Sequence, residues 1–301
     1  MRVGKIIDTF EVVEEKTDII WKVKKNDEFF IMKLFYKGTF DLYTREVQFN
    51  PFIIQSGKYK KHHYIVMTLF PTTLDGFITD LYTIDVIDMP LMLVMVDKLK
   101  NSLREMHSRK IIHRDIKPEN IVLTKTFDEI ITGADFDVYF IDYELAHPFN
   151  CGCLTPMTGT ICFVAPEILM GKKYDYRIDI WSLGCCIYEL FMGESLFDGE
   201  NPQSILDDME RLCGPISVPN RLSRIHKKDK WLLHKLRKNW SNKDSKLLHD
   251  IIAPLLTKLI RIKVDGAAFF LISSTSIRSG FTVKRASINI TFIRNFSGMV
   301  K

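Results

Sequence analysis

Three side chains suited to phosphoryl transfer lie within six positions of one another in the stretch IIHRDIKPENIVL, residues 111–123. They are Asp115, Lys117 and Asn120, and apolar residues flank them. This chemistry needs a carboxylate to orient the attacking hydroxyl, an oxygen ligand for a magnesium ion, and a cation near the moving phosphate. We expect Asp115, Asn120 and Lys117 to fill these roles in that order. The alternative is a polar loop in which Asp115 and Asn120 act as turn and capping residues.

Another lysine and two more acids extend this set. Lys33 ends the apolar segment FFIMK, and an inward-facing ammonium there is costly unless a carboxylate pairs with it. Glu46, thirteen residues later, can supply that carboxylate and orient Lys33 toward phosphates. The alternative is a solvated surface lysine. Asp142 follows the apolar segment VYFI, and we expect it to be a second ligand of Mg²⁺.

The elements that must position these residues differ between the two parts of the chain. Before residue 70 the sequence predicts an antiparallel meander with one helix. Its strands are FEVVEE (10–15), DIIWKVKK (18–25), EFFIMKLF (28–35) and HYIVMTLF (63–70). The helical spacing of FDLYTREVQFNPFI, from residue 40, stops near Pro51.

From Asp88 onward the pattern is mostly helical. Helices are predicted in the segments 89–110, 179–193 and 201–214. The fold class is therefore α+β, with a small antiparallel-sheet lobe at 1–70 and a large, mostly helical lobe at 71–265. We expect inserts near 124–137 and 217–245, and an atypical basic tail at 266–301.

The composition is that of an ordinary globular protein, with 301 residues, 46% apolar and 26% charged. All six cysteines follow residue 150, so we expect no disulfide framework and an intracellular location, nuclear or cytoplasmic. The pair Cys151 and Cys153 is half a metal-binding pattern without a second half. The net charge of +5 gives no reason to expect nucleic acid as a partner. No apolar run approaches the ~18 residues of a membrane span, no signal peptide is expected, and we expect a monomer.

Four motifs occur in an order that resembles the eukaryotic protein kinase superfamily over about residues 5–262. They are H-R-D-x-K-P-x-N at 113–120, Asp-Tyr-Glu at 142–144 in place of Asp-Phe-Gly, GTICFVAPE at 159–167, and DIWSLG at 179–184. The resemblance implies the two-lobed protein kinase fold, ATP and Mg²⁺ as cofactors, and transfer of the γ-phosphate to Ser/Thr hydroxyls of a protein substrate. It implies that Lys33 holds the α- and β-phosphates. It also places Ile20 over the adenine, and Met67, Leu69 and Phe70 at the hinge that binds the nucleotide.

A closer resemblance, to the LAMMER (CLK) dual-specificity kinases, rests on SILDDMERLCGPI, residues 204–216. Leu206, Met209, Glu210 and Arg211 are in register with the LAMMER box. An insert precedes Asp142, and the basic run 221–240 follows the box. The resemblance implies Tyr as an additional acceptor and Arg/Ser-rich splicing factors as substrates. The alternatives are an amphipathic helix of a generic kinase for the box, and a solvated insert or a docking site for an acidic partner or RNA for the basic run.

The sequence departs from the family pattern at several positions, and the missing glycines favour another hypothesis, a pseudokinase scaffold without turnover. The expected glycine-rich loop is VEEKTDII (13–20), and its two glutamates, Glu14 and Glu15, would repel ATP if they faced it. Glu144 replaces a glycine, which would limit the local backbone flip. The arginine partner of Glu167 is missing, because its place falls near Ala267.

The segment after Asp142 offers sites for an activating phosphate. Arg114 can hold such a phosphate, and Thr155, Thr158 and Thr160 are the candidates. We expect Thr160 to engage Asp115 and Lys117, and Thr158 to lie too close to that anchored stretch to reach back. Thr155 is therefore the predicted phosphosite.

Overall fold

The computed structural model describes residues 3–84, 88–149, 158–199, 201–213 and 230–257. All of them fall within one compact unit, Met1–Arg261. Four predicted features lie outside the described residues: the basic tail, residues 221–229 of the basic run, both cysteines of the Cys-Gly-Cys pair, and Thr155.

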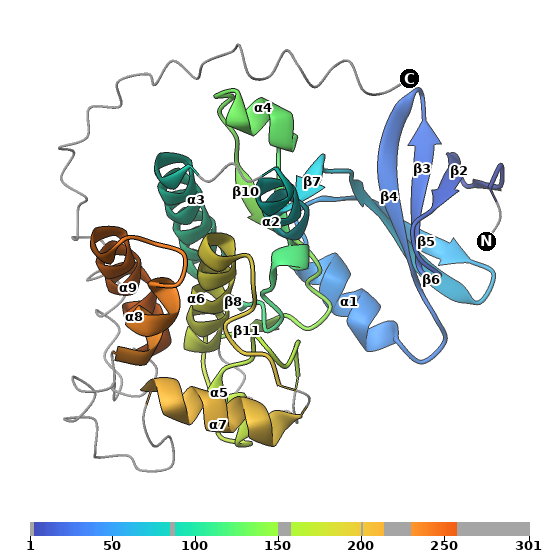
Figure 1. The fold of residues 1–301 in the computed structure, drawn as a ribbon. Helices are drawn as coiled ribbons and strands as arrows, with labels where there is room; N and C mark the ends of the chain where they lie inside the picture. The colour runs from blue at the N-terminus through green and yellow to red at the C-terminus, as the bar shows by residue number, and fades with distance from the viewer. Residues whose placement is uncertain (1–2, 85–87, 150–157, 200, 214–229, 258–301) are drawn as a thin grey trace. The chain divides into compact units, whose positions relative to one another are not determined.

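A curled antiparallel sheet forms the N-terminal part (Figure 1). Its strand order is β1-β2-β3-β4-β6-β5. The strands are β1 (Ile6–Ile7), β2 (Phe10–Glu15), β3 (Ile20–Lys25), β4 (Glu28–Phe35), β5 (Ile53–Tyr59) and β6 (His62–Thr68). The four predicted strands are present. The sequence did not predict β1 or β5, and β3 begins two residues later than expected.

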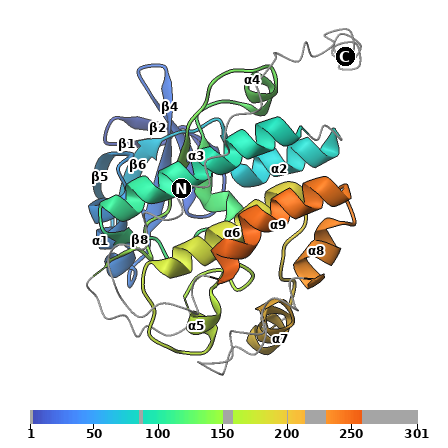
Figure 2. The ribbon, with the colours of Figure 1, turned by 90° about the vertical axis from the view of Figure 1, so that its left-hand side faces the viewer.

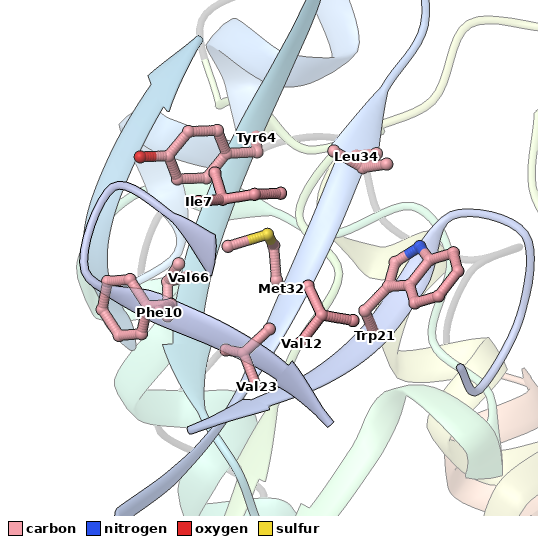
Figure 3. Close-up of a cluster of buried hydrophobic side chains, with 9 residues drawn as sticks. All are labelled: Ile7, Phe10, Val12, Trp21, Val23, Met32, Leu34, Tyr64 and Val66. Atoms are coloured by element: carbon pink, nitrogen blue, oxygen red, sulfur yellow. The ribbon is translucent and has the colours of Figure 1, made fainter. Parts of the chain in front are cut away.

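One face of this sheet buries an apolar cluster, drawn in Figure 3. Strand alternation explains it, since register places Trp21 opposite Met32 and Val12 opposite Val23. The opposite face holds the residues in between, and there Ile20 lies opposite Lys33. The predicted site lysine is thus on the face turned away from the cluster in Figure 3.

Helix α1 (Phe40–Phe49) packs against β4 and β6 (Figure 1). Leu42 and Tyr43 lie against a second apolar cluster that contains Phe35 and Ile65. The helix ends at Phe49, near the predicted stop at Pro51, and it buries Glu46.

Helices form most of the remainder (Figures 1 and 2). Three of them were predicted: α3 (Met89–Ser108), α6 (Arg177–Met192) and α7 (Pro202–Cys213). Helix α6 packs between α3 and α9 (Asn242–Thr257) and is buried almost along its whole length, as its apolar sequence requires. The other helices are α2 (Leu74–Thr83), α4 (Phe127–Ile131), α5 (Pro166–Leu169) and α8 (Lys230–Leu236).

Two small sheets brace the stretch that contains the candidate residues. Strands β7 (Thr72–Thr73), β9 (Ile121–Leu123) and β10 (Val138–Phe140) form one, in the order β10-β9-β7. Strands β8 (Ile111–Ile112) and β11 (His147–Pro148) form the other. Between β8 and β9 the chain has a single 3₁₀ turn, Pro118–Asn120.

The predicted α+β class, with a small antiparallel-sheet lobe and a larger, mostly helical one, is confirmed. The boundaries at residues 70 and 265 remain predictions. Within the first predicted insert, α4 begins with a capping box between Thr126 and Glu129. Among the described residues, no helix combines the length and the apolarity needed to cross a membrane.

Candidate active site

Asp115 and Asn120 are joined directly. The Nδ2 of Asn120 donates to the backbone oxygen of Asp115 at 2.9 Å and to its Oδ2 at 3.1 Å. The amide oxygen of Asn120 accepts no hydrogen bond within the described part of the chain. The tight turn that starts at Pro118 brings the two residues together, so the sequence spacing predicted this contact.

Thr160 and Lys117 complete the surroundings of Asp115. The backbone N–H and the hydroxyl of Thr160 both donate to Asp115 Oδ1, each at 3.0 Å. Lys117 Nζ lies 3.8 Å from Asp115 Oδ2. The predicted engagement of Thr160 with Asp115 is confirmed, and the three residues proposed for phosphoryl transfer lie together.

Two buried residues to which the sequence analysis gave no role, Asp179 and His107, support the loop that carries Asp115. Asp179, at the start of α6, accepts the backbone N–H groups of His113 at 2.8 Å and Arg114 at 2.9 Å. It also lies 2.9 Å from Nε2 of His107, on α3. An acid in the first turn of a helix that is otherwise apolar is the sequence signal that could have identified Asp179.

Lys33 is nearly buried, with 5% of its surface exposed. Its Nζ lies 2.7 Å from Asp142 Oδ1 and 3.1 Å from Glu144 Oε2. Burial alone would lower the pKa of Lys33, but Asp142, Glu46 and Glu144 together raise it above its ordinary value. The ammonium is therefore charged, and the interpretation of Lys33 as a solvated surface residue is wrong.

The predicted ion pair between Lys33 and Glu46 is not formed among the described residues. Glu46 is fully buried, and its Oε1 accepts from Nδ2 of Asn50 at 2.7 Å. Its Oε2 has no hydrogen-bond partner in the described part of the chain. Burial raises the pKa of Glu46 to about 7, although the nearby charge of Lys33 opposes this. Lys33 is paired instead with Asp142 and Glu144, while the carboxylate of Glu46 accepts from Asn50.

The segment that carries Asp142 is fixed on both sides. Tyr143 is buried, and its ring lies 4.9 Å from that of His113. On the other side, Nε of Arg45, on α1, donates to the backbone oxygen of Glu144 at 2.7 Å. Asp142 itself has a φ of +66°, in the left-handed region that few non-glycine residues adopt. These contacts hold the metal-ligand candidate beside Lys33.

The resemblance places the glycine-rich loop at the turn between β2 and β3. The backbone amides of this turn donate hydrogen bonds within the turn itself. The N–H groups of Lys16 and Thr17 donate to the oxygen of Ile20 at 2.9 and 3.0 Å. Those of Ile19 and Ile20 donate to Oγ1 of Thr17 at 3.3 and 3.0 Å. Four N–H groups that a phosphate-binding loop would offer to a ligand are thus already bonded within the turn.

The two glutamates of this turn lie on opposite faces of the sheet. Glu14 is opposite Lys22, and therefore on the face that carries Lys33, whereas Glu15 is opposite Trp21, on the other face. Glu14 lies 2.6 Å from Nζ of Lys16, and this hydrogen bond lowers its pKa. Both glutamates were expected to repel ATP, but only Glu14 lies on the face of the sheet where it can do so.

The predicted adenine and hinge residues follow the same strand register. Ile20 and Met67 lie on the Lys33 face, because Ile20 is opposite Lys33 and Met67 is opposite Ile31. Leu69 and Phe70 are half-buried just after β6 ends. Their assignment to the nucleotide remains a prediction.

Arg114 contacts a different threonine from the one predicted. Its Nη2 donates to Oγ1 of Thr158 at 3.0 Å, so the expectation that Thr158 lies too close to reach back is wrong. Glycine is needed next to Thr158, because Gly159 has a φ of +99° and a Cβ there would lie 2.7 Å from the backbone oxygen of Arg114. Glu167 is half-buried, and burial raises its pKa. The position near Ala267, where its arginine partner was expected, lies outside the described residues.

The donor set fits the metal and nucleotide that the resemblance implies. A carboxylate and an amide oxygen, from Asp142 and Asn120, are the hard oxygen ligands that Mg²⁺ prefers, and Mg²⁺ commonly uses only one or two protein ligands. No cluster of three or more His, Cys, Asp or Glu side chains suited to a metal occurs among the described residues, which excludes a cage built only from such side chains there. The charged Lys33 is suited to phosphate oxygens.

Residues 41–260 match the family model described as Protein kinase domain. Since this match covers more than half of the chain, the protein belongs to the protein kinase domain family. The matched span contains Asp115, Asn120 and Asp142, whereas Lys33 precedes it.

Curated relatives agree with this assignment. The chain is 35% identical over 113 residues to the serine/threonine-protein kinase prpf4B of Dictyostelium discoideum, covering 38% of this chain and 13% of the relative. It is 32% identical over 158 residues to the probable serine/threonine-protein kinase clkA of the same organism (44% and 16%). It is 34% identical over 168 residues to the serine/threonine-protein kinase nekl-2 of Caenorhabditis elegans (54% and 43%). The similarity thus spans less than half the length of each of these relatives.

Proposed function

We propose that this chain is an active, ATP-dependent protein kinase that transfers a phosphoryl group to Ser/Thr hydroxyls of protein substrates. The observation that carries the proposal is the anchoring of Asp115. Asn120 and Thr160 hold its carboxylate from two sides, and Lys117 lies beside it. A carboxylate fixed in this way can orient an acceptor hydroxyl and take its proton during transfer.

The other residues have separable tasks. Asn120 and Asp142 would hold Mg²⁺, which supplies charge neutralisation of the phosphates. Lys33 provides a charge for the α- and β-phosphates, and Lys117 one for the transferring group. Ile20, Met67, Leu69 and Phe70 would surround the adenine.

The self-bonded turn between β2 and β3 bears on the alternative of a scaffold without turnover. Because its amides are engaged, we expect weak ATP binding. Weak binding differs from inactivity, however, since Lys33, Asp115, Asn120 and Asp142, the residues proposed for the chemistry, are all present in the sequence. Similarity to several serine/threonine kinases also favours the enzyme over the scaffold.

We further propose a LAMMER-like specificity, with Arg/Ser-rich splicing factors as substrates and Tyr as an additional acceptor. Helix α7 contains the box residues, with Met209 buried and Arg211 exposed. The likeness to clkA supports this choice. An intracellular monomer, nuclear or cytoplasmic, completes the proposal.

A phosphorylation assay with three matched peptides tests both the kinase activity and the LAMMER-like specificity. The peptides are Arg/Ser-rich, the same peptide with Tyr replacing each Ser, and a basic peptide without hydroxyls. We expect phosphate on the first, less on the second and none on the third, with Asp115→Asn reducing the rate by at least ~100-fold. Equal rates for Asp115→Asn and wild type would contradict the catalytic assignment. Preference for Ser/Thr peptides without arginine would contradict only the LAMMER-like specificity.

A further inference from the structure

Three aromatic rings from α1 and β6 form a cluster at the surface of the N-terminal part. The ring of Tyr43 stacks on that of His63 with 4.7 Å between their centroids, and the ring of Phe40 lies 5.0 Å from the same imidazole. Phe40 is 55% exposed, whereas Tyr43 and His63 are half-buried. Phe40 is therefore not an isolated exposed apolar residue, and apolar surface gathered in one place marks a site of interaction.

Helix α1 extends this cluster along its exposed side. Phe40, Tyr43 and Val47 are spaced by three and four positions, which places them on one face of the helix. Val47 is 39% exposed, while Phe49, on the other side of the helix, is buried. Phe40 and Val47 are thus large apolar side chains that the fold does not bury.

The β5–β6 hairpin supplies positive charge beside the cluster. Lys58 lies opposite His63 in the strand register, so its side chain is on the face that carries the cluster. Lys60 and Lys61 form the turn of the hairpin, and all three lysines are exposed. No ion pair engages these lysines in the part of the chain that the structure describes. Residues 51–70 contain no Asp or Glu that could compensate their charge.

Asp41 is an exposed acid on α1, next in sequence to Phe40. Successive residues of a helix are about 100° apart around its axis, so Asp41 lies about 100° to one side of Phe40 and Tyr43 about 60° to the other. Asp41 is therefore on the side away from His63, on which Tyr43 stacks. The surface has an apolar centre and a basic edge, and electrostatic complementarity requires an acidic partner.

We propose that the exposed face of α1 and the β5–β6 hairpin together bind an acidic peptide segment of a partner protein. This hairpin–helix surface consists of Phe40, Tyr43, Val47, Lys58, Lys60, Lys61 and His63. An aromatic or large aliphatic side chain of the segment packs on the apolar centre, and the Asp or Glu residues beside it pair with the lysines. The inference goes beyond the proposed function, because none of these residues takes part in the chemistry assigned to Asp115.

A single-stranded nucleic acid is the other ligand that lysines and aromatic rings could attract. It fits this surface less well, because a base needs a free ring face on which to stack. Tyr43 and His63 already stack on each other, and the aliphatic Val47 offers no ring. An acidic peptide uses both the aliphatic and the aromatic part of the surface.

Selection from a random dodecapeptide library displayed on phage tests this proposal, with the full chain as bait and no nucleotide present. Only peptides that bind the wild type and are not retained by Phe40→Ser are kept. A kept peptide is synthesised, and fluorescence anisotropy gives its dissociation constant. Phe29→Ser is the matched control, because Phe29 is an exposed phenylalanine of the same sheet, at the start of β4.

The contribution of charge is tested with a second pair of variants. Lys60→Gln with Lys61→Gln removes two charges from the hairpin turn. Lys172→Gln with Lys173→Gln is its control, since these two lysines are also adjacent and exposed. We expect the kept peptides to carry Asp or Glu on both sides of an aromatic or large aliphatic residue. The hairpin variant should weaken binding about tenfold at low ionic strength, and less as salt is added, while the controls leave it unchanged.

No enrichment of peptides, enriched peptides without acidic residues, or equal losses in the control variants would overturn the inference. Oligothymidine that binds the wild type and loses affinity in Phe40→Ser would also overturn it, because the surface would then serve a nucleic acid. Melting curves identify a variant that fails to fold, in which case Val47→Ser replaces Phe40→Ser. The measurement uses no ATP, so absence of kinase activity would contradict the proposed function while leaving this result intact.

Discussion

Glu46 is a buried acid, so its ionisation makes the free energy of unfolding depend on pH. Its pKa is about 7 in the folded chain, against 4.5 ordinarily, with burial as the main cause. The folded state therefore binds this proton more tightly than the unfolded state. Its stabilising contribution is fully present below pH 4.5 and is lost as the pH rises through about 7.

Replacing Glu46 by Gln should remove this pH dependence. We expect the free energy of unfolding of Glu46→Gln, relative to wild type, to increase between pH 5 and pH 8 by up to about 3 kcal/mol. Urea titrations of both proteins at the two pH values measure it. A difference between the proteins that is the same at both pH values would contradict the assignment of a raised pKa to Glu46.

Glu14 and Glu15 give a matched pair of substitutions at the β2–β3 turn. Glu14→Gln removes a negative charge from the face that carries Lys33 and releases Lys16 from its ion pair. We expect the dissociation constant of Mg-ATP to fall about two- to fivefold, as for other exposed charges. Glu15→Gln, on the other face, should leave it unchanged. Calorimetric titration gives the dissociation constant of Mg-ATP for both variants. Equal effects of the two substitutions would show that the face on which each glutamate lies does not decide its effect on ATP binding.

Among the elements, the loop that carries Asp115 depends on a glycine outside it. A Cβ at Gly159 would collide with the backbone of Arg114 and displace Thr160, which holds Asp115. Gly133 is the natural comparison, because it has a similar φ of +95° but no heavy atom within 4 Å of such a Cβ among the described residues.

We expect Gly159→Ala to lower kcat/KM by at least about tenfold, through misplacement of Asp115. Gly133→Ala should cost about 1–2 kcal/mol of stability from its backbone conformation alone and leave kcat/KM unchanged. Steady-state kinetics and thermal melting of the two variants separate these effects. Similar kinetic losses in both would mean that backbone strain, and not the contact with Arg114, limits activity.

Local contacts at the site were predictable, and contacts between distant elements were not. Asp115 and Asn120 are five residues apart across one tight turn, so their spacing was sufficient to bring them together. The pairing of Lys33 with Glu144 joins β4 to a segment more than a hundred residues later, and it depends on side-chain length at a substituted position. The hydrogen bond that Asp179 accepts from the loop likewise could not be predicted, because it depends on where α6 begins relative to the loop.

Across the whole molecule, the family model matches the chain from residue 41 onward and not the strands that precede it. The family match begins at residue 41, after the turn that lacks glycine and after Lys33. The sheet that carries Lys33 is nevertheless complete and has its own apolar cluster (Figure 3). The residues proposed for the site therefore lie on an intact framework, while the turn proposed to contact phosphates has its amides bonded within itself.

The central claim, phosphate transfer that depends on a metal-binding Asp142, is tested most directly by one assay. The wild-type chain and Asp142→Asn are incubated with γ-labelled ATP, Mg²⁺ and a basic Ser/Thr-containing protein, after melting curves confirm that both fold. We predict label on the substrate with the wild type, and at least a ~100-fold lower rate with Asp142→Asn, because the ligand of the metal loses its charge. Equal rates of transfer by the two proteins, or no transfer by the folded wild type at saturating ATP, would contradict the account.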